Sequence, residues 1–120
     1  MKVINLGEQN SVLNQFVSEI RDVNIQKDSL RFRRNLERIG EIFAYEISKT
    51  LNYVPSEVET PLGIANIQLC NQTIVLGTIL RAGLPLHQGL LNYFDCAQNS
   101  FIAAYRKYGK DNKFTIQIEY

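Results

Sequence analysis

The stretch TILRAGLPLHQGLL, residues 78–91, passes from an apolar run into an arginine, a glycine and a second apolar segment. Residues 72–80, which overlap the start of this stretch, are almost entirely apolar. Such a run is typical of a parallel strand covered on both faces. Gly83 permits a tight turn, and Pro85 suits the first turn of a helix. We therefore expect a buried strand, a short loop at Arg81 and then a helix.

The segments after this loop continue the same pattern. The expected helix has an apolar side made of Leu84, Leu86, Leu90, Leu91 and Phe94. A second apolar run, SFIAAY at residues 100–105, follows it, so strand, helix and strand form a βαβ unit with a right-handed crossover. KFTIQIEY, residues 113–120, alternates apolar and polar residues and predicts a half-exposed strand after a turn at residues 109–112.

Two helices are expected before the sheet. Apolar residues recur at spacings of three and four at Val12, Leu13, Phe16, Val17 and Ile20. Asn10 or Ser11 can cap this first helix. A longer helix is expected from about Ser29 to Leu51, with charged residues mostly outside its apolar stripe.

Residues 53–70, YVPSEVETPLGIANIQLC, predict a β-hairpin with its turn at Pro61 and Gly63. Its prolines confine these strands to a sheet edge or an outlying flap. The fold class is therefore α/β, with N-terminal helices, a β-hairpin flap and the first strands of a parallel sheet. Because the chain stops at Tyr120 in mid-strand, we expect residues 1–120 to be the N-terminal portion of a single, longer domain.

Composition narrows the class of protein. A net charge of +1 over 120 residues implies no general attraction to nucleic acid or to an acidic membrane. No run approaches the roughly 20 apolar residues that span a bilayer, and residues 1–11 contain no long apolar region, so we do not expect them to be a signal peptide. Cys70 and Cys96 form no CxxC motif, so we expect no zinc site and interpret them as reduced, mostly buried thiols of a cytosolic protein. The arginines of the long helix are interpreted as an ion-paired, solvated face, with nucleic-acid binding as a minor alternative: Arg31, Arg33, Arg34 and Arg38.

The loop at Arg81 has the residues of an anion site. In open α/β sheets, ligands bind beyond the carboxyl ends of the strands. A small-residue turn lets backbone N–H groups approach an anion, and a guanidinium matches phosphate oxygens. Arg106 follows the next expected strand, so two arginines should meet at one edge of the sheet. The alternative is an arginine exposed at a strand end, with a glycine that only makes the turn. His87, the single histidine, is interpreted as a helix-surface residue rather than a catalyst.

Residues 78–91, followed by AAYRKYGKDNKFTIQIEY at residues 103–120, resemble the uracil phosphoribosyltransferases, a family with the type I phosphoribosyltransferase fold. The helix sequence SLRFRRNLERIGEIFAYEISKTL, residues 29–51, is similar to the family's N-terminal helix. The resemblance covers essentially the whole chain but only the first part of the family's sequence. It departs at residues 85–87, where relatives usually have glycine and methionine.

The resemblance implies how the site would work. Arg81 and Arg106 would contact the phosphate groups of phosphoribosyl pyrophosphate, and Ala82 and Gly83 would supply backbone groups. Family loops of this kind can hold a non-proline cis peptide. The implied reaction, in pyrimidine salvage, joins uracil to this donor to give UMP and pyrophosphate. Magnesium would arrive with the donor, and the family forms cytoplasmic homodimers.

The family's acidic-Thr-Gly-Gly loop for the ribose phosphate and its uracil-recognising segment have no counterpart in this sequence. This chain alone is therefore expected to be inactive. Two alternatives follow. The chain is a truncated, non-catalytic fragment, or it belongs to a related phosphoribosyltransferase or regulatory protein that binds the same donor.

Overall fold

The computed structural model describes residues 2–108 and 114–119, and its first half is helical. The elements in order are η1 (Leu6–Glu8), α1 (Val12–Arg21), η2 (Ile25–Lys27) and α2 (Ser29–Ser48). Ser11 caps α1 by accepting a hydrogen bond from the N–H of Leu13, and Asp28 caps α2 in the same way. Both predicted helices are confirmed, although α2 ends at Ser48 rather than at Leu51.

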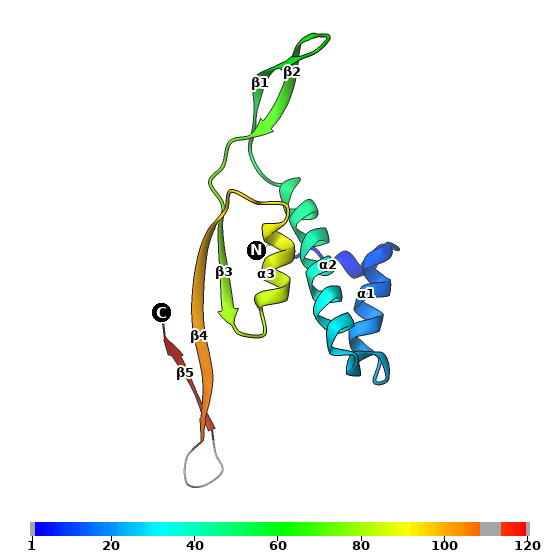
Figure 1. Ribbon diagram of the computed structural model, residues 1–120, viewed down its shortest axis with the longest axis vertical. Helices are drawn as coiled ribbons and strands as arrows, with labels where there is room; N and C mark the ends of the chain where they lie inside the picture. The colour runs from blue at the N-terminus through cyan, green and yellow to red at the C-terminus, as the bar shows by residue number, and fades with distance from the viewer. Residues whose placement is uncertain (1, 109–113, 120) are drawn as a thin grey trace.

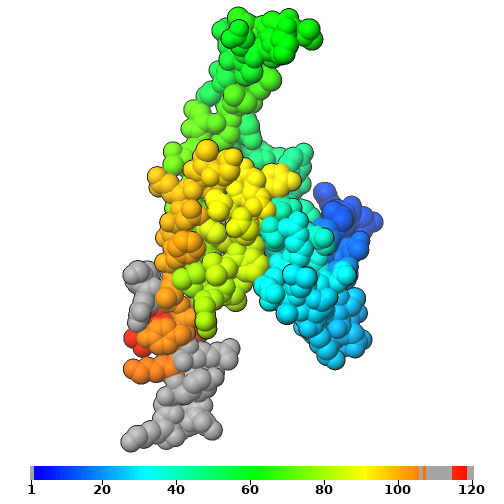
Figure 2. All heavy atoms as spheres, in the orientation of Figure 1, coloured from blue at the N-terminus to red at the C-terminus, as the bar shows by residue number. Residues whose placement is uncertain are grey.

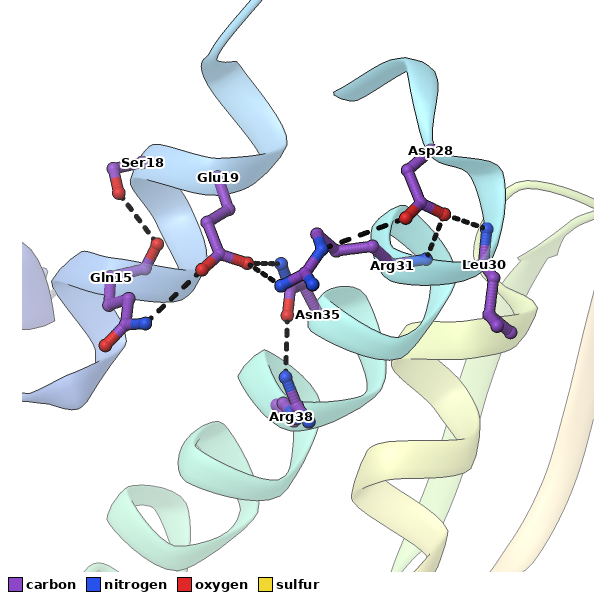
Figure 3. Close-up of polar contacts among 8 residues, drawn as sticks. All are labelled: Gln15, Ser18, Glu19, Asp28, Leu30, Arg31, Asn35 and Arg38. Carbon is purple, nitrogen blue, oxygen red and sulfur yellow. Dashed lines mark hydrogen bonds and ion pairs between the residues drawn. The ribbon is translucent and has the colours of Figure 1, made fainter. Parts of the chain in front are cut away.

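A cluster of polar side chains joins α1 to α2 (Figure 3). Asn35 is fully buried; its Nδ2 donates to Glu19 at 2.7 Å and its Oδ1 accepts from Arg38 at 3.1 Å. Arg31 adds a 3.3 Å ion pair to the same Glu19 carboxylate, and Arg34 pairs with Glu37 at 2.7 Å. The arginines of α2 therefore include ion-paired members, as predicted.

The hairpin of β1 (Tyr53–Thr60) and β2 (Gly63–Cys70) forms a two-stranded antiparallel sheet of its own. Gly63 has a φ of 126°, a conformation that glycine adopts without strain. The hairpin projects from the rest of the chain (top of Figure 1), which confirms the predicted flap. At its base, the N–H of Asn71 donates to the carbonyl of Asn52 at 3.4 Å.

The second sheet contains β3 (Val75–Leu80), β4 (Gln98–Tyr108) and β5 (Phe114–Glu119), in that spatial order. β3 and β4 are parallel and are joined by α3 (Leu84–Leu91), so the predicted βαβ unit is confirmed. β5 runs antiparallel to β4. The predicted turn at residues 109–112 lies outside the described residues.

The elements pack in successive layers, with the sheet against α3, α3 against α2, and α2 against α1 (Figure 1). Only one face of β3 is covered, because Leu76 and Thr78 are buried whereas Val75 and Ile79 are exposed. The predicted coverage of both faces is therefore wrong for the part of the chain that the structure describes. Alternation along the paired strands places exposed Ile116 and Ile118 of β5 on the same open face.

The molecule is long and thin, measuring 70 × 35 × 30 Å, and its outline narrows toward the hairpin (Figure 2). Its radius of gyration is 19.0 Å, against the roughly 14 Å expected for a compact domain of this length. The buried apolar core of the described residues is correspondingly small: Leu13, Ile39, Ala44 and Leu76.

Candidate functional site

Residues 81–83 form the loop that links the carboxyl end of β3 to α3. The peptide bond between Leu80 and Arg81 is cis, as the family resemblance led us to expect. Arg81 and Ala82 are exposed, and Gly83 is half-buried. The loop therefore presents its arginine and its backbone to solvent at the sheet edge where ligands of α/β proteins bind.

Hydrogen bonds divide the backbone N–H groups of this loop into two kinds. The N–H of Gly83 donates to Ile79 at 3.2 Å, and that of Leu84 donates to the carbonyl of Arg81 at 3.2 Å. The N–H groups of Arg81 and Ala82 donate to no acceptor within residues 2–108 and 114–119. Two successive donors are thus available to an outside acceptor, next to the guanidinium and ahead of a helix N-terminus.

Gly83 is required by packing rather than by its backbone angles. Its φ is −74°, which any residue adopts. A Cβ at this position would lie 2.9 Å from Cγ2 of Thr78 and 2.8 Å from the carbonyl oxygen of Ile79. The sequence pointed to the right residue as a turn former, but its observed role is to let the loop fold tightly over the end of β3.

Arg106 lies inside β4 and not after it, which corrects the predicted strand end. Leu80 pairs with Ala103, and β4 then continues to Tyr108 while Arg106 pairs with Ile116 of β5. Hydrogen bonds from β5 keep β4 extended beyond the end of β3. The side chain of Arg106 lies outside the described part of the structure, so its convergence with Arg81 stays a prediction.

His87 is buried, contrary to the interpretation as a helix-surface residue. Its side chain lies between α3 and the sheet, and the residue is 7% exposed. Nδ1 is 2.6 Å from Oγ1 of Thr78, and Nε2 is 2.7 Å from Oδ1 of Asn99. The Phe101 ring lies 5.2 Å away between centroids. The sequence reasoning missed this contact, although a single polar ring in an otherwise apolar helix was a signal for it.

The surroundings of α3 explain why His87 is almost fully buried. Gly89 packs against α2, where a Cβ would clash with the Glu37 carbonyl, while Thr78 of β3 and Asn99 and Phe101 of β4 contact the His87 ring. Leu84, predicted to belong to the apolar side, is 43% exposed instead. The buried side of this helix is therefore rotated from the one that leucine spacing predicted.

Both cysteines are exposed, which corrects the prediction of mostly buried thiols. Cys70 ends β2 in the projecting hairpin, and Cys96 lies in the loop before β4. A hydrogen bond to Asp95, together with its negative charge, raises the pKa of the Cys96 thiol. The thiol form of Cys96 is therefore favoured, which lowers its reactivity.

Other features of the described residues lie away from the loop. A groove of about 920 Å³ runs between the N-terminal segment, α1 and α2, and its lining includes Leu13, Val17 and Phe43 but not Arg81. No group of three His, Cys, Asp or Glu side chains among these residues could hold a metal ion. None of the helices described is both long enough and apolar enough to cross a membrane.

The parallel βαβ unit and the arginine loop beyond β3 define a partial α/β fold of the phosphoribosyltransferase type. The solved structure of the AQ2163 protein from Aquifex aeolicus has a similar fold, with a TM-score of 0.64 and 23% identity over 91% of this chain and 51% of that one. A model of the uracil phosphoribosyltransferase family matches residues 7–116. The chain therefore belongs to the uracil phosphoribosyltransferase family.

Named relatives agree with this assignment. The uracil phosphoribosyltransferase of Porphyromonas gingivalis is 57% identical over 120 residues, which are 100% of this chain and 56% of that protein. The uracil phosphoribosyltransferase of Thermococcus gammatolerans is 36% identical over 94% of this chain and 50% of its own length. The chain thus spans about half the length of the curated relatives that it matches.

Proposed function

We propose that this chain is the donor-binding part of an enzyme that converts uracil and phosphoribosyl pyrophosphate into UMP and pyrophosphate. The observation that carries the proposal is the loop at residues 81–83. There, an exposed guanidinium lies beside two available N–H groups at the carboxyl end of β3. Membership of the uracil phosphoribosyltransferase family supports uracil as the acceptor.

The loop suits the pyrophosphate of the donor. The guanidinium of Arg81 presents a planar fork of donors to phosphate oxygens, and the N–H groups of Arg81 and Ala82 add two more. Arg106, on the neighbouring strand, would supply a second cation to the same anion. Because negative charge grows on the pyrophosphate as its bond to the ribose breaks, donors held in place here favour the transition state.

Magnesium would enter this site as a counter-ion of the donor. The described residues offer no cluster of three metal-binding side chains, so the phosphate oxygens would supply most of its ligands. The contribution of the chain itself is then to bind and orient the pyrophosphate through Arg81 and its loop.

Donor binding is testable on the chain itself. Calorimetric titration of the 120-residue chain with phosphoribosyl pyrophosphate and magnesium should show binding that Arg81→Ala weakens about tenfold or more, because a charge-assisted hydrogen bond is lost. Arg33→Ala, which alters an exposed arginine of α2, should bind like the unaltered chain. Equal affinity of Arg81→Ala and the unaltered chain would contradict the proposal.

A second candidate is a protein that binds the donor without turning it over, because the loop at residues 81–83 would serve that function equally well. A turnover assay with uracil separates the two functions. UMP formed by the chain, alone or joined to the C-terminal part of the Porphyromonas gingivalis relative, supports the enzyme. Turnover only with another base would indicate a related phosphoribosyltransferase.

We also propose that the protein acts in the cytoplasm as a homodimer. The projecting hairpin exposes large apolar side chains, including Leu62, Ile64 and Ile67, that a second copy could cover. The two free, exposed cysteines of the chain, Cys70 and Cys96, suit a reducing compartment. Light scattering measures the mass in solution, and a monomer at all concentrations would contradict the dimer; cell fractionation tests the compartment.

A further inference from the structure

We propose that His87 is a positioning residue for the anion loop, and that its hydrogen bond with Thr78 sets the affinity of the loop for pyrophosphate. The inference rests on the proposed function, because it concerns the same loop. His87 and Thr78 are both buried, at 7% and 8% exposure, and they stand on opposite sides of residues 81–83. The bond between them therefore closes the base of the loop.

Both backbone and side-chain hydrogen bonds join the end of β3 to the first turn of α3. The N–H of His87 donates to the Gly83 carbonyl at 2.9 Å, and the N–H of Gly83 donates to Ile79 at 3.2 Å. The Thr78–His87 side-chain bond, at 2.6 Å, crosses between the same two segments. These bonds fix the distance between the end of β3 and the first turn of α3. The exposed N–H groups of Arg81 and Ala82 lie in the loop between them.

Asn99 fixes the ring from the third side. Nε2 of His87 lies 2.7 Å from Oδ1 of Asn99, which can only accept, so we assign the donated proton to Nε2; Nδ1, 2.6 Å from Oγ1 of Thr78, would then accept from the hydroxyl in the neutral ring. The ring therefore joins β3, α3 and β4 in one continuous chain of hydrogen bonds. The Thr78–His87 bond is buried and the His87–Asn99 bond is part-buried, and together they specify one position of the ring, because a shift would leave a polar group unpaired.

Thr78 also touches the loop directly. Its Cγ2 methyl lies where a Cβ on Gly83 would approach to 2.9 Å, so the side chain that holds His87 also packs beneath Gly83. A change at this hydroxyl is therefore transmitted to the loop by contact and through the backbone. An apolar residue at position 87 would fill the space without specifying where α3 begins relative to β3.

Two substitutions at residue 78 separate the hydrogen bond from the packing. Thr78→Val keeps the shape and removes the hydroxyl, which leaves Nδ1 of His87 without its donor. Thr78→Ser keeps the hydroxyl and removes the methyl group. We expect Thr78→Val to weaken magnesium pyrophosphate binding about tenfold, because a buried acceptor loses its partner, while Thr78→Ser stays within about twofold.

The measurement follows the amide signals of residues 81–83 by NMR during titration of the 120-residue chain with magnesium pyrophosphate. Because His87 is the only histidine, its ring signals are assigned directly and report the tautomer. We expect the Nε2-protonated ring in the unaltered chain, a changed ring signal in Thr78→Val, and a response of the ring to pyrophosphate. The Nδ1-protonated form in the unaltered chain would overturn the assignment.

A stability control excludes a purely structural role. Leu13→Ala shortens a buried side chain of α1, which packs on α2 and contacts neither α3 nor β3 among the described residues, and lowers the melting temperature. It should leave pyrophosphate affinity unchanged. Equal affinity loss in Leu13→Ala and Thr78→Val, or no loss in Thr78→Val, overturns the inference.

The proposed function and this inference fail in different ways. If the unaltered chain binds pyrophosphate and Arg81→Ala does not, the function stands, and the Thr78 variants alone decide the role of His87. If Arg81→Ala binds as well as the unaltered chain, the loop is not the pyrophosphate site and both proposals fall.

Discussion

Gly40 of α2 and Gly89 of α3 lie against each other where the two helices cross. A Cβ at Gly40 would lie 3.1 Å from the Cα of Gly89 and closer still to the Leu86 carbonyl oxygen. Backbone atoms cannot rotate out of the way as a side chain can, so both positions need glycine. This crossing holds α3, and with it residues 81–83, against the N-terminal helices.

Gly40→Ala should destabilise the protein by about 1–3 kcal/mol, because the added methyl forces the helices apart. The effect opposes intrinsic preference, since alanine favours a helix over glycine by about 1 kcal/mol. Gly77→Ala is the matched control, because a Cβ there meets nothing within 4 Å. Thermal unfolding followed by circular dichroism compares the two; a Gly40→Ala protein as stable as the control would contradict the close crossing.

Asn35→Ala should cost about 1–3 kcal/mol, because Glu19 loses its buried amide donor. The hydrogen bond from Asn35 is the largest cause of the lowered pKa of Glu19, followed by that from Gln15. The substitution should therefore also move the pKa of Glu19 up toward its ordinary value of 4.5. Denaturant unfolding and an NMR titration measure the two effects, with exposed Asn14→Ala as the control.

Acid should weaken the contact between α2 and α3. The ion pair with Arg34 and then the hydrogen bond from Asn92 lower the pKa of Glu37 below its ordinary 4.5. A lowered folded-state pKa gives stabilisation that is present above the unfolded value and lost as pH falls through the folded value. The melting temperature should thus fall below about pH 4.5, with a smaller slope in Glu37→Gln.

Glu57→Gln, on the exposed side of the hairpin, is the control for this pH series. Its slope should match that of the unaltered chain. Identical slopes in Glu37→Gln and the unaltered chain would show that Glu37 does not link proton binding to folding.

Asp95→Asn should increase the rate at which Cys96 reacts with a thiol reagent near neutral pH. The aspartate raises the pKa of this thiol, and the thiolate is the nucleophile. Exposed Cys70, at the end of β2, serves as an internal control whose rate should not change. Mass spectrometry after brief alkylation measures both sites; an unchanged Cys96 rate would remove Asp95 as the cause.

Local pattern predicted the elements well. Ser11 and Pro85 mark helix starts that the structure contains, and the apolar runs around the Arg81 loop became parallel strands. These signals depend on residues that are close in sequence, so they can be recognised from the sequence alone. The hairpin turn with its positive-φ Gly63 belongs to the same class.

The sequence pattern could not predict which faces of the helices and strands are covered by other segments. His87 is buried because α2 and the sheet cover both sides of its helix, and Val75 is exposed because nothing among the described residues covers that face. Arg106 lies within a strand because β5 pairs beside it. Each of these features depends on which segment, distant in sequence, packs against the residue. The spacing of residues within one element does not predict that.

The base of the hairpin has a consequence for how the chain can be changed. Asn52 and Asn71 are already joined by a backbone hydrogen bond, and the N–H of Asn52 also donates to the Gln72 side chain at 2.6 Å. The path from α2 to β3 is therefore short without residues 53–70. The hairpin behaves as a detachable module: it could be shortened, exchanged with that of a relative or removed, and the ends to be rejoined already lie side by side.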